Sequence, residues 1–127
     1  MTDYNSNSLE LARKAIEDML DRSVKAQAKF RPGTSQHSLQ VNRIKALSIS
    51  LALLSTETAK TIHTRYSSQE LVFAIAPLTS LIHKSEKSQT NLKPNTWQYS
   101  MLSSNLKALY LALDALNGVI DKNHTLE

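Results

Sequence analysis

Apolar residues recur along the chain at spacings of three and four residues, which places their side chains on one face of an α-helix. Stripes of this kind occupy four stretches, and each stretch predicts one helix. Their main positions are Leu9, Ala12, Ile16, Met19; Ile44, Leu47, Leu51, Leu54; Leu71, Ala74, Leu78, Leu81; and Leu106, Leu109, Leu113, Leu116. The pattern therefore predicts an all-α protein.

The second half of the chain repeats the first half at an offset of 62 residues. Residues 4–65 align without a gap with residues 66–127, and 17 of the 62 pairs are identical. Chance at ordinary residue frequencies would give about 4 identities. We therefore predict one domain over residues 1–127, built from two tandem αα-hairpin repeats.

Polar residues mark where the predicted helices begin. Ser67 followed by Glu70 forms a capping box that predicts the start of the third helix, and Asn7 with Glu10 predicts the start of the first. The first helix then covers about residues 7–30, and residues 58–66 form the linker between the repeats.

A short proline turn separates the two helices of each repeat, at residues 31–33 and 93–95. Proline disfavours helix in the residue before it, and Thr34 and Thr96, or else Gly33 and Asn95, are expected to cap the helices that follow. Connections this short require the two helices of a repeat to run antiparallel.

Two residues predict irregularities in the second repeat. Pro77 lies inside the third helix, where the first repeat has Ala15, and it predicts a bend rather than an end. The pair Asn117 and Gly118 predicts the end of the fourth helix through a left-handed Gly118.

A single hairpin exposes its apolar stripe, so the two repeats are expected to cover each other. We predict an antiparallel up-down-up-down four-helix bundle, made of two tandem αα-hairpin repeats with pseudo-twofold symmetry. In this arrangement both proline turns lie at the same end.

Composition narrows the functional classes. The chain has 2 glycines, 3 prolines and no cysteine, which argues against an all-β fold, disulfides and thiol chemistry. The longest apolar run covers residues 71–78, far short of the roughly 20 residues of a membrane span. No signal-peptide pattern precedes the first stripe, so we expect a cytoplasmic protein.

The titratable residues do not form a recognisable metal or catalytic set. His83 and Glu86 are three residues apart, but in the reverse order to the Glu-x-x-His pairs of di-iron bundles. No phosphate loop, nucleophile elbow or dinucleotide motif occurs. We therefore expect no metal, no cofactor and no enzymatic activity.

Basic residues concentrate around the two turns. Residues 22–45 carry six Lys or Arg and no acid, and residues 84–107 carry four Lys and one Glu. In the predicted bundle they form one basic pole, which would bind a small anion or nucleic acid. Its candidate residues are Lys25, Arg31, Thr34, Gln36, Lys87, Lys93, Thr96 and Gln98. Simple helix capping also explains the Thr and Gln residues.

The third helix has lost the polar face of its counterpart. Glu10, Arg13, Lys14 and Glu17 of the first repeat correspond to Val72, Ile75, Ala76 and Thr79. Together with Phe73, these residues predict an apolar surface that packs on a second subunit, on another protein, or under the linker residues Ile62 and Tyr66.

These observations favour a small, non-enzymatic helical protein that acts by interaction or oligomerisation through the third helix, as a homodimer. The alternative is a module that binds nucleic acid or a small anion at the basic pole. The sequence does not identify a biological role.

Overall fold

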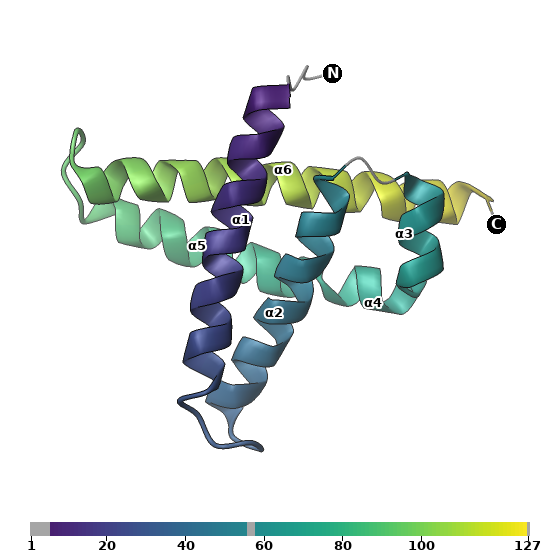
Figure 1. Ribbon diagram of the computed structural model, residues 1–127, viewed down its shortest axis with the longest axis horizontal. Coiled ribbons are helices and arrows are strands. Elements are labelled where there is room, and N and C mark those ends of the chain that lie inside the picture. The colour runs from purple at the N-terminus through teal and green to yellow at the C-terminus, as the bar shows by residue number, and fades with distance from the viewer. Residues whose placement is uncertain (1–5, 56–57, 127) are drawn as a thin grey trace.

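The computed structural model describes residues 6–55 and 58–126, and side chains within residues 7–55 and 58–121. All regular elements in these ranges are helices (Figure 1). They are α1 (Ser6–Gln27), α2 (Ser35–Leu53), α3 (Ala59–Arg65), α4 (Ser68–Phe73), α5 (Ile75–Thr90) and α6 (Trp97–Leu126). The all-α prediction is confirmed, and the assembly resembles a helical bundle.

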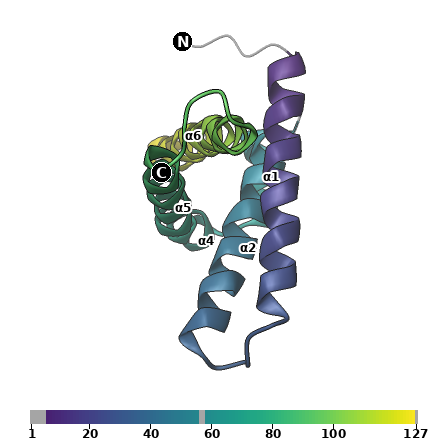
Figure 2. The ribbon, with the colours of Figure 1, turned by 90° about the vertical axis from the view of Figure 1, so that its left-hand side faces the viewer.

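The helices form two antiparallel pairs that cross each other. α1 pairs with α2 and α5 pairs with α6, and Figures 1 and 2 show the axes of the first pair running steeply across those of the second. The turns at residues 28–34 and 91–96 therefore lie at different ends of the molecule. The prediction of four helices lying lengthwise in an up-down-up-down bundle is wrong in this respect.

The crossing follows from where the apolar stripes end. On α1 the buried stripe passes from Met19 to Ser23, and on α2 it passes from Leu47 back to Arg43. On α6, Asn105 takes the corresponding buried position before Leu109. Each of these three stripes thus has a buried polar residue on the side of its turn. The pairs contact each other where both are apolar and diverge toward the turns.

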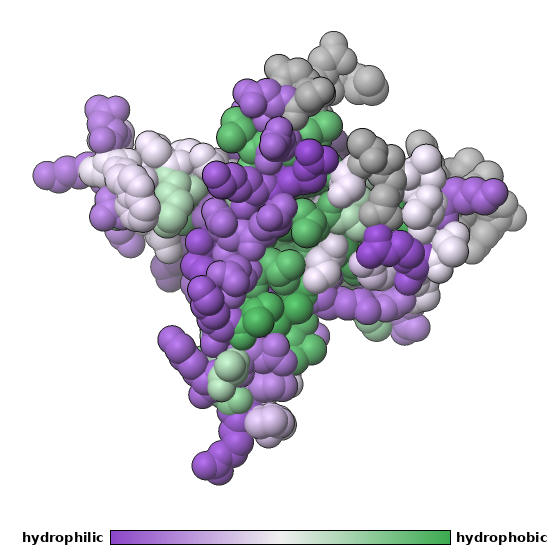
Figure 3. Space-filling model, in the orientation of Figure 1, coloured by the Kyte–Doolittle hydropathy of each residue, from purple (hydrophilic) through white to green (hydrophobic). Residues whose placement is uncertain are grey.

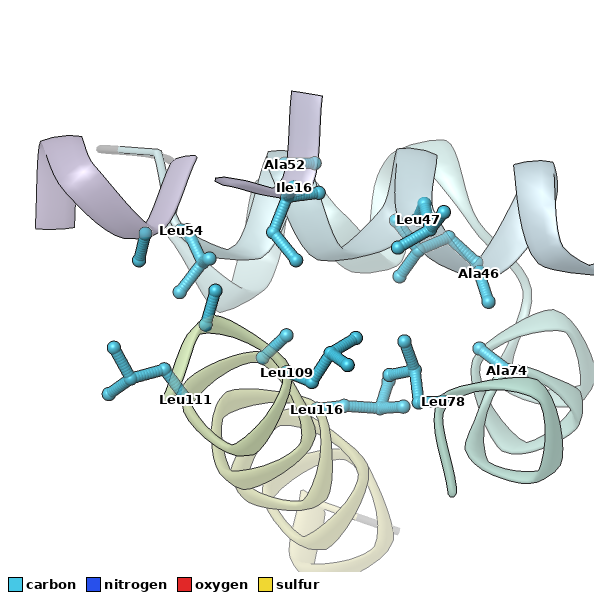
Figure 4. Close-up of a cluster of buried hydrophobic side chains, with 14 of the residues drawn as sticks. Ile16, Ala46, Leu47, Ala52, Leu54, Ala74, Leu78, Leu109, Leu111 and Leu116 are labelled. Atoms are coloured by element: carbon cyan, nitrogen blue, oxygen red, sulfur yellow. The ribbon is translucent and has the colours of Figure 1, made fainter. Parts of the chain in front are cut away.

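The core lies at this crossing. Figure 4 shows Ile16 of α1 and Leu47 of α2 close to Leu78 of α5 and to Leu109 and Leu116 of α6. All five side chains are fully buried. Burying one such side chain is worth about 1.5–3 kcal/mol, so the helix pairs depend on each other for their hydrophobic stabilisation.

The two turns have the same local geometry. Gly33 has φ +90° and Asn95 has φ +74°, and both are followed by a capping threonine. Thr34 Oγ1 accepts the His37 backbone N–H at 3.2 Å, and Thr96 Oγ1 accepts that of Tyr99 at 3.2 Å. The predicted threonine caps are therefore confirmed, and the left-handed residue before each cap is one of the types that tolerate positive φ.

The predicted linker is itself helical. Residues 59–65 form α3, which is capped by Thr58 and packs against α6. The Ser67 capping box is confirmed, because Ser67 Oγ accepts the Glu70 N–H at 3.0 Å and Glu70 Oε1 accepts the Ser67 N–H at 2.8 Å. At the first helix, Asn7 lies inside α1, which begins at Ser6, so it is not the predicted cap.

Pro77 produces a break rather than the predicted bend of a continuous helix. α4 ends at Phe73, Ala74 separates the two helices, and α5 begins at Ile75. This places Pro77 in the first turn of α5, where a backbone N–H has no intrahelical partner to lose. The break thus lies three residues before the proline that causes it.

The predicted end of the last helix at Gly118 is wrong. α6 continues to Leu126, and Gly118 does not have a positive φ. Val119 and Ile120 follow it and pack against the core. Their burial outweighs the low helix propensity of glycine.

None of the helices within residues 6–55 and 58–126 combines the length and the apolar composition that a membrane span requires.

Candidate functional site

The residues of the predicted basic pole form two separate groups. The turn at 28–34 and the turn at 91–96 stand far apart in Figure 1, so the predicted single pole is replaced by two distinct surfaces. Several members also have local partners: Lys25 Nζ lies 3.0 Å from Asp21 Oδ2, and the threonine hydroxyls donate to Arg31 O and Lys93 O at 2.7 and 2.8 Å. The remaining candidates, Gln36, Lys87 and Gln98, are exposed.

The five residues of the predicted apolar surface lie together on α4 and α5. Val72 is 47% exposed and Phe73 is 65% exposed. Ile62 is buried in the core and Tyr66 packs against it, so the linker leaves this surface uncovered. Of the three occupants considered from sequence, the linker is therefore excluded.

Two adjoining grooves follow this surface. One, of about 430 Å³, is lined by Leu39, Asn42, Phe73, Ala76, Pro77 and Ser80. The other, of about 650 Å³, is lined by Val72, Ile75, Ala76, Thr79, Ser80 and His83. We call these residues together the apolar face. It contains no Asp, Glu, Lys or Arg.

The apolar face extends onto the first helix pair through α2. Leu39 lines the first groove beside Phe73, and Val41 is also exposed on α2. Figure 3 shows hydrophobic surface along α2 beside the polar surface of α1. The exposed apolar area is therefore not confined to α4 and α5.

A cavity of about 590 Å³ lies between the two helix pairs, and it is lined by the C-terminal parts of α1 and α5 and the N-terminal parts of α2 and α6, which lead into and out of the two turns. We call it the crossing cavity. Four of the five buried polar residues of the described chain line it: Ser23, Gln40, Arg43 and Asn105. The fifth, Ser50, donates to Ala46 O at 2.8 Å and is satisfied within α2. Buried polar groups thus concentrate at one place.

Arg43 is the unusual member of the crossing cavity. Its residue is only 8% exposed, and its Nε atom has no hydrogen-bond partner in the described structure. Burial lowers the pKa of its guanidinium, which nevertheless stays charged because an arginine keeps its proton in proteins. The fold thus places the Arg43 guanidinium in the wall of the crossing cavity, with its Nε atom buried and without a counterion among the described residues.

Sequence reasoning missed Arg43, Gln40 and Asn105, although a signal was present. Continuing the stripe of the second helix backward from Leu47 in steps of four and three reaches Arg43 and then Gln40. A charged residue on a core stripe is rare unless it has a partner. Attention to polar residues inside the stripes would have found them.

The histidines have structural neighbours. His63 Nε2 lies 3.1 Å from Val119 O, and His37 Nε2 lies 3.4 Å from the Gln27 side chain. Within the described ranges, no three His, Asp or Glu side chains gather in a way that could hold a metal ion.

The remaining contacts tie helices together. Tyr110 Oη donates to Glu86 Oε2 at 2.6 Å and links α6 to α5, while Lys45 on α2 pairs with Glu70 at the start of α4.

Comparisons with protein-family models, with curated proteins and with solved structures find no match to this chain.

Proposed function

We propose that the protein is a non-enzymatic helical interaction protein that binds a second copy of itself through the apolar face. The observation that carries the proposal is the 65% exposure of Phe73 beside two uncharged grooves. A large aromatic side chain next to apolar grooves is typical of an interaction site rather than of ordinary surface.

The absence of formal charge in the apolar face favours self-association. In a twofold contact, the same patch of both subunits meets itself, so any charged residue near the axis faces its own copy and is repelled. The chain carries a net charge of +4, yet its Lys and Arg residues lie outside the apolar face. Two copies can therefore approach here despite their equal charge.

The shape of the apolar face also suits a twofold contact. Phe73 is exposed and lines the first groove, which adjoins the groove lined by Val72, Ile75 and Thr79. In a symmetric dimer, Phe73 of each copy would enter that groove of the partner. Buried aromatic anchors in such pockets supply much of the binding free energy of interfaces.

We further propose that the two helix pairs descend from a duplicated hairpin. Only the second copy acquired a surface that mediates self-association. The matching turns support this, since Gly33 and Asn95 both have positive φ before a threonine cap. Residues Glu10, Arg13, Lys14 and Glu17 keep the equivalent face of α1 polar.

Analytical ultracentrifugation of the wild type and of two matched variants tests self-association. Phe73→Glu places a charge in the centre of the apolar face. Leu11→Glu is the control, because Leu11 is the residue of the first repeat that corresponds to Phe73 and is similarly exposed, at 61%.

We expect the wild type and Leu11→Glu to sediment as dimers at high micromolar concentration and Phe73→Glu as a monomer. Circular dichroism of all three proteins checks that they fold. A monomeric wild type, or a dimer that Phe73→Glu leaves intact, contradicts the proposal.

A further inference from the structure

The crossing cavity has a one-sided distribution of charge. Its charged lining residues are Arg22, Arg43 and Lys84, and none of its lining residues is acidic. In the described chain, no ion pair or hydrogen bond engages these three side chains. The cavity is therefore a positively charged recess at the junction of the two helix pairs.

Arg43 is the one charged residue of this lining that is buried. The buried Nε atom of Arg43 loses its hydration and gains no hydrogen bond from the described residues in exchange. Replacing such a group with an apolar residue is often neutral or stabilising, so stability alone does not explain an arginine at this position. An unsatisfied buried group of this kind needs an explanation, and a ligand bound in the cavity is one.

Neutral hydrogen-bonding groups surround the same space. Gln40 and Asn105 are buried in the cavity wall and have no hydrogen-bond partners among the described residues. Each carries an amide that donates two hydrogen bonds. Together with the guanidinium of Arg43, they provide donors from both helix pairs.

The rest of the wall is apolar. Met19, Leu81, Met101 and Leu102 line the cavity, and Trp97 lies at its rim with 72% of its surface exposed. A volume of about 590 Å³ falls within the range of small-molecule sites, about 300–1,000 Å³. An occupant would thus contact both donors and hydrophobic surface.

We propose that the crossing cavity binds a small organic oxyanion, a phosphate monoester or carboxylate attached to an apolar or aromatic group. The oxyanion accepts hydrogen bonds from Arg43, which suits planar, two-pronged binding of such groups. Gln40 and Asn105 donate to the same group, and Arg22 and Lys84 add positive charge. The apolar part lies on the methionine and leucine side chains, with Trp97 over it.

This site differs from the basic surfaces at the turns. Those surfaces are exposed, and their threonines are already used as caps. The crossing cavity instead exists only where the two helix pairs meet, and its central charge is buried.

Trp97 is the only tryptophan of the chain, so its fluorescence reports on the rim of the crossing cavity. The probes are inorganic phosphate, phenyl phosphate, benzoate and uncharged phenol, titrated at low ionic strength. We expect phenyl phosphate or benzoate to bind at least about tenfold more tightly than phenol, because only the anions pair with Arg43.

The comparison of phenyl phosphate with benzoate distinguishes a phosphate site from a carboxylate site. Inorganic phosphate measures the contribution of the apolar wall and is expected to bind more weakly than phenyl phosphate. Phenol binding as tightly as both organic anions, or no saturable response to either anion by fluorescence and calorimetry, overturns the proposal.

Arg43→Met tests the central residue, with Arg31→Met as a control for loss of one positive charge at an exposed turn. We expect Arg43→Met to weaken binding of the tighter anion about tenfold or more, with a melting temperature equal to or above that of the wild type. Arg31→Met is expected to bind as the wild type does. Equal losses in both variants would show diffuse attraction and overturn the proposal.

Lys84→Met keeps the test decisive should Arg43→Met fail to fold. Lys84 is exposed and its removal leaves the core intact, and we expect a severalfold loss of affinity. Unchanged affinity in Lys84→Met together with a non-folding Arg43→Met would assign Arg43 a structural role and overturn the proposal.

Discussion

The two helix pairs contribute similar apolar stripes to one core but have different outer surfaces. In the first pair, α1 runs unbroken from Ser6 to Gln27 and carries charged residues on its outer face. In the second pair, the equivalent region is broken at Ala74 and is apolar outside as well as inside. The shared part is the inner stripe, which both pairs need for folding. Most of the outer face lies outside the core, although Ile75 of α5 also packs against it.

The strongest test of this comparison concerns the shared inner stripe. Leu47 and Leu109 align with each other at the offset of 62 residues and are both fully buried. Leu47→Ala and Leu109→Ala are each expected to lower the free energy of unfolding by about 2–5 kcal/mol, because each opens a cavity in one common core. Urea denaturation followed by circular dichroism measures both.

A single transition with similar losses would show that the helix pairs unfold as one unit. Leu11→Ala is the matched control on the exposed face and is expected to change stability little. Two separate transitions, with one variant affecting only one of them, would contradict the common core.

A smaller effect is expected from the break between α4 and α5. Pro77→Ala introduces the residue type found at the aligned position, Ala15. The substitution permits a continuous helix through Ala74 and should raise helix content and stabilise the protein by about 1 kcal/mol. Far-ultraviolet circular dichroism and urea denaturation measure the two quantities. A destabilised Pro77→Ala would show that the break itself is needed for packing.

The smallest effect is expected at the ion pair between Lys45 of α2 and Glu70 of α4. The aligned residues Lys107 and Ser8 cannot form such a pair. The pKa of Glu70 lies below its ordinary value of 4.5, chiefly because Lys45 donates a hydrogen bond to its carboxylate, with help from the Ser67 backbone. A lowered folded pKa means that ionised Glu70 stabilises the fold above pH 4.5. This contribution disappears as the pH falls through the lowered value.

Lys45→Met should therefore reduce stability at pH 7 slightly and weaken its decline under acid conditions. Lys107 aligns with Lys45 at the offset of 62 residues, and the residue that aligns with Glu70 is Ser8, which has no carboxylate. Lys107→Met therefore serves as the control. Thermal unfolding between pH 3 and 7 compares the two variants. Identical pH profiles for both variants would refute a specific role for the pair.

Much of the fold was predictable because it is encoded locally. The spacing of apolar residues predicts the helices, and the caps at Thr34 and Ser67 depend on residues three positions apart. The crossing of the helix pairs was not predictable from the stripe period, because that period does not say how far each stripe stays apolar. The polar interruptions at Ser23 and Arg43 decide it.

The same distinction applies to the candidate sites. The apolar face could be predicted because Val72 and Ile75 align with the charged residues Glu10 and Arg13 at the offset of 62 residues. The crossing cavity required knowledge of which residues of separate helices meet. Gly118 was misread for a related reason, since the packing of Val119 and Ile120 against distant residues keeps α6 helical.

The position of Arg43 links folding to solution composition. Its surroundings come from both helix pairs and are dispersed in the unfolded chain. An anion that binds there stabilises the folded state alone, so by mass action the melting temperature rises with the concentration of that anion. The stability of the fold would then depend on the anion in the solution. Phenyl phosphate would raise the melting temperature more than chloride does at equal ionic strength.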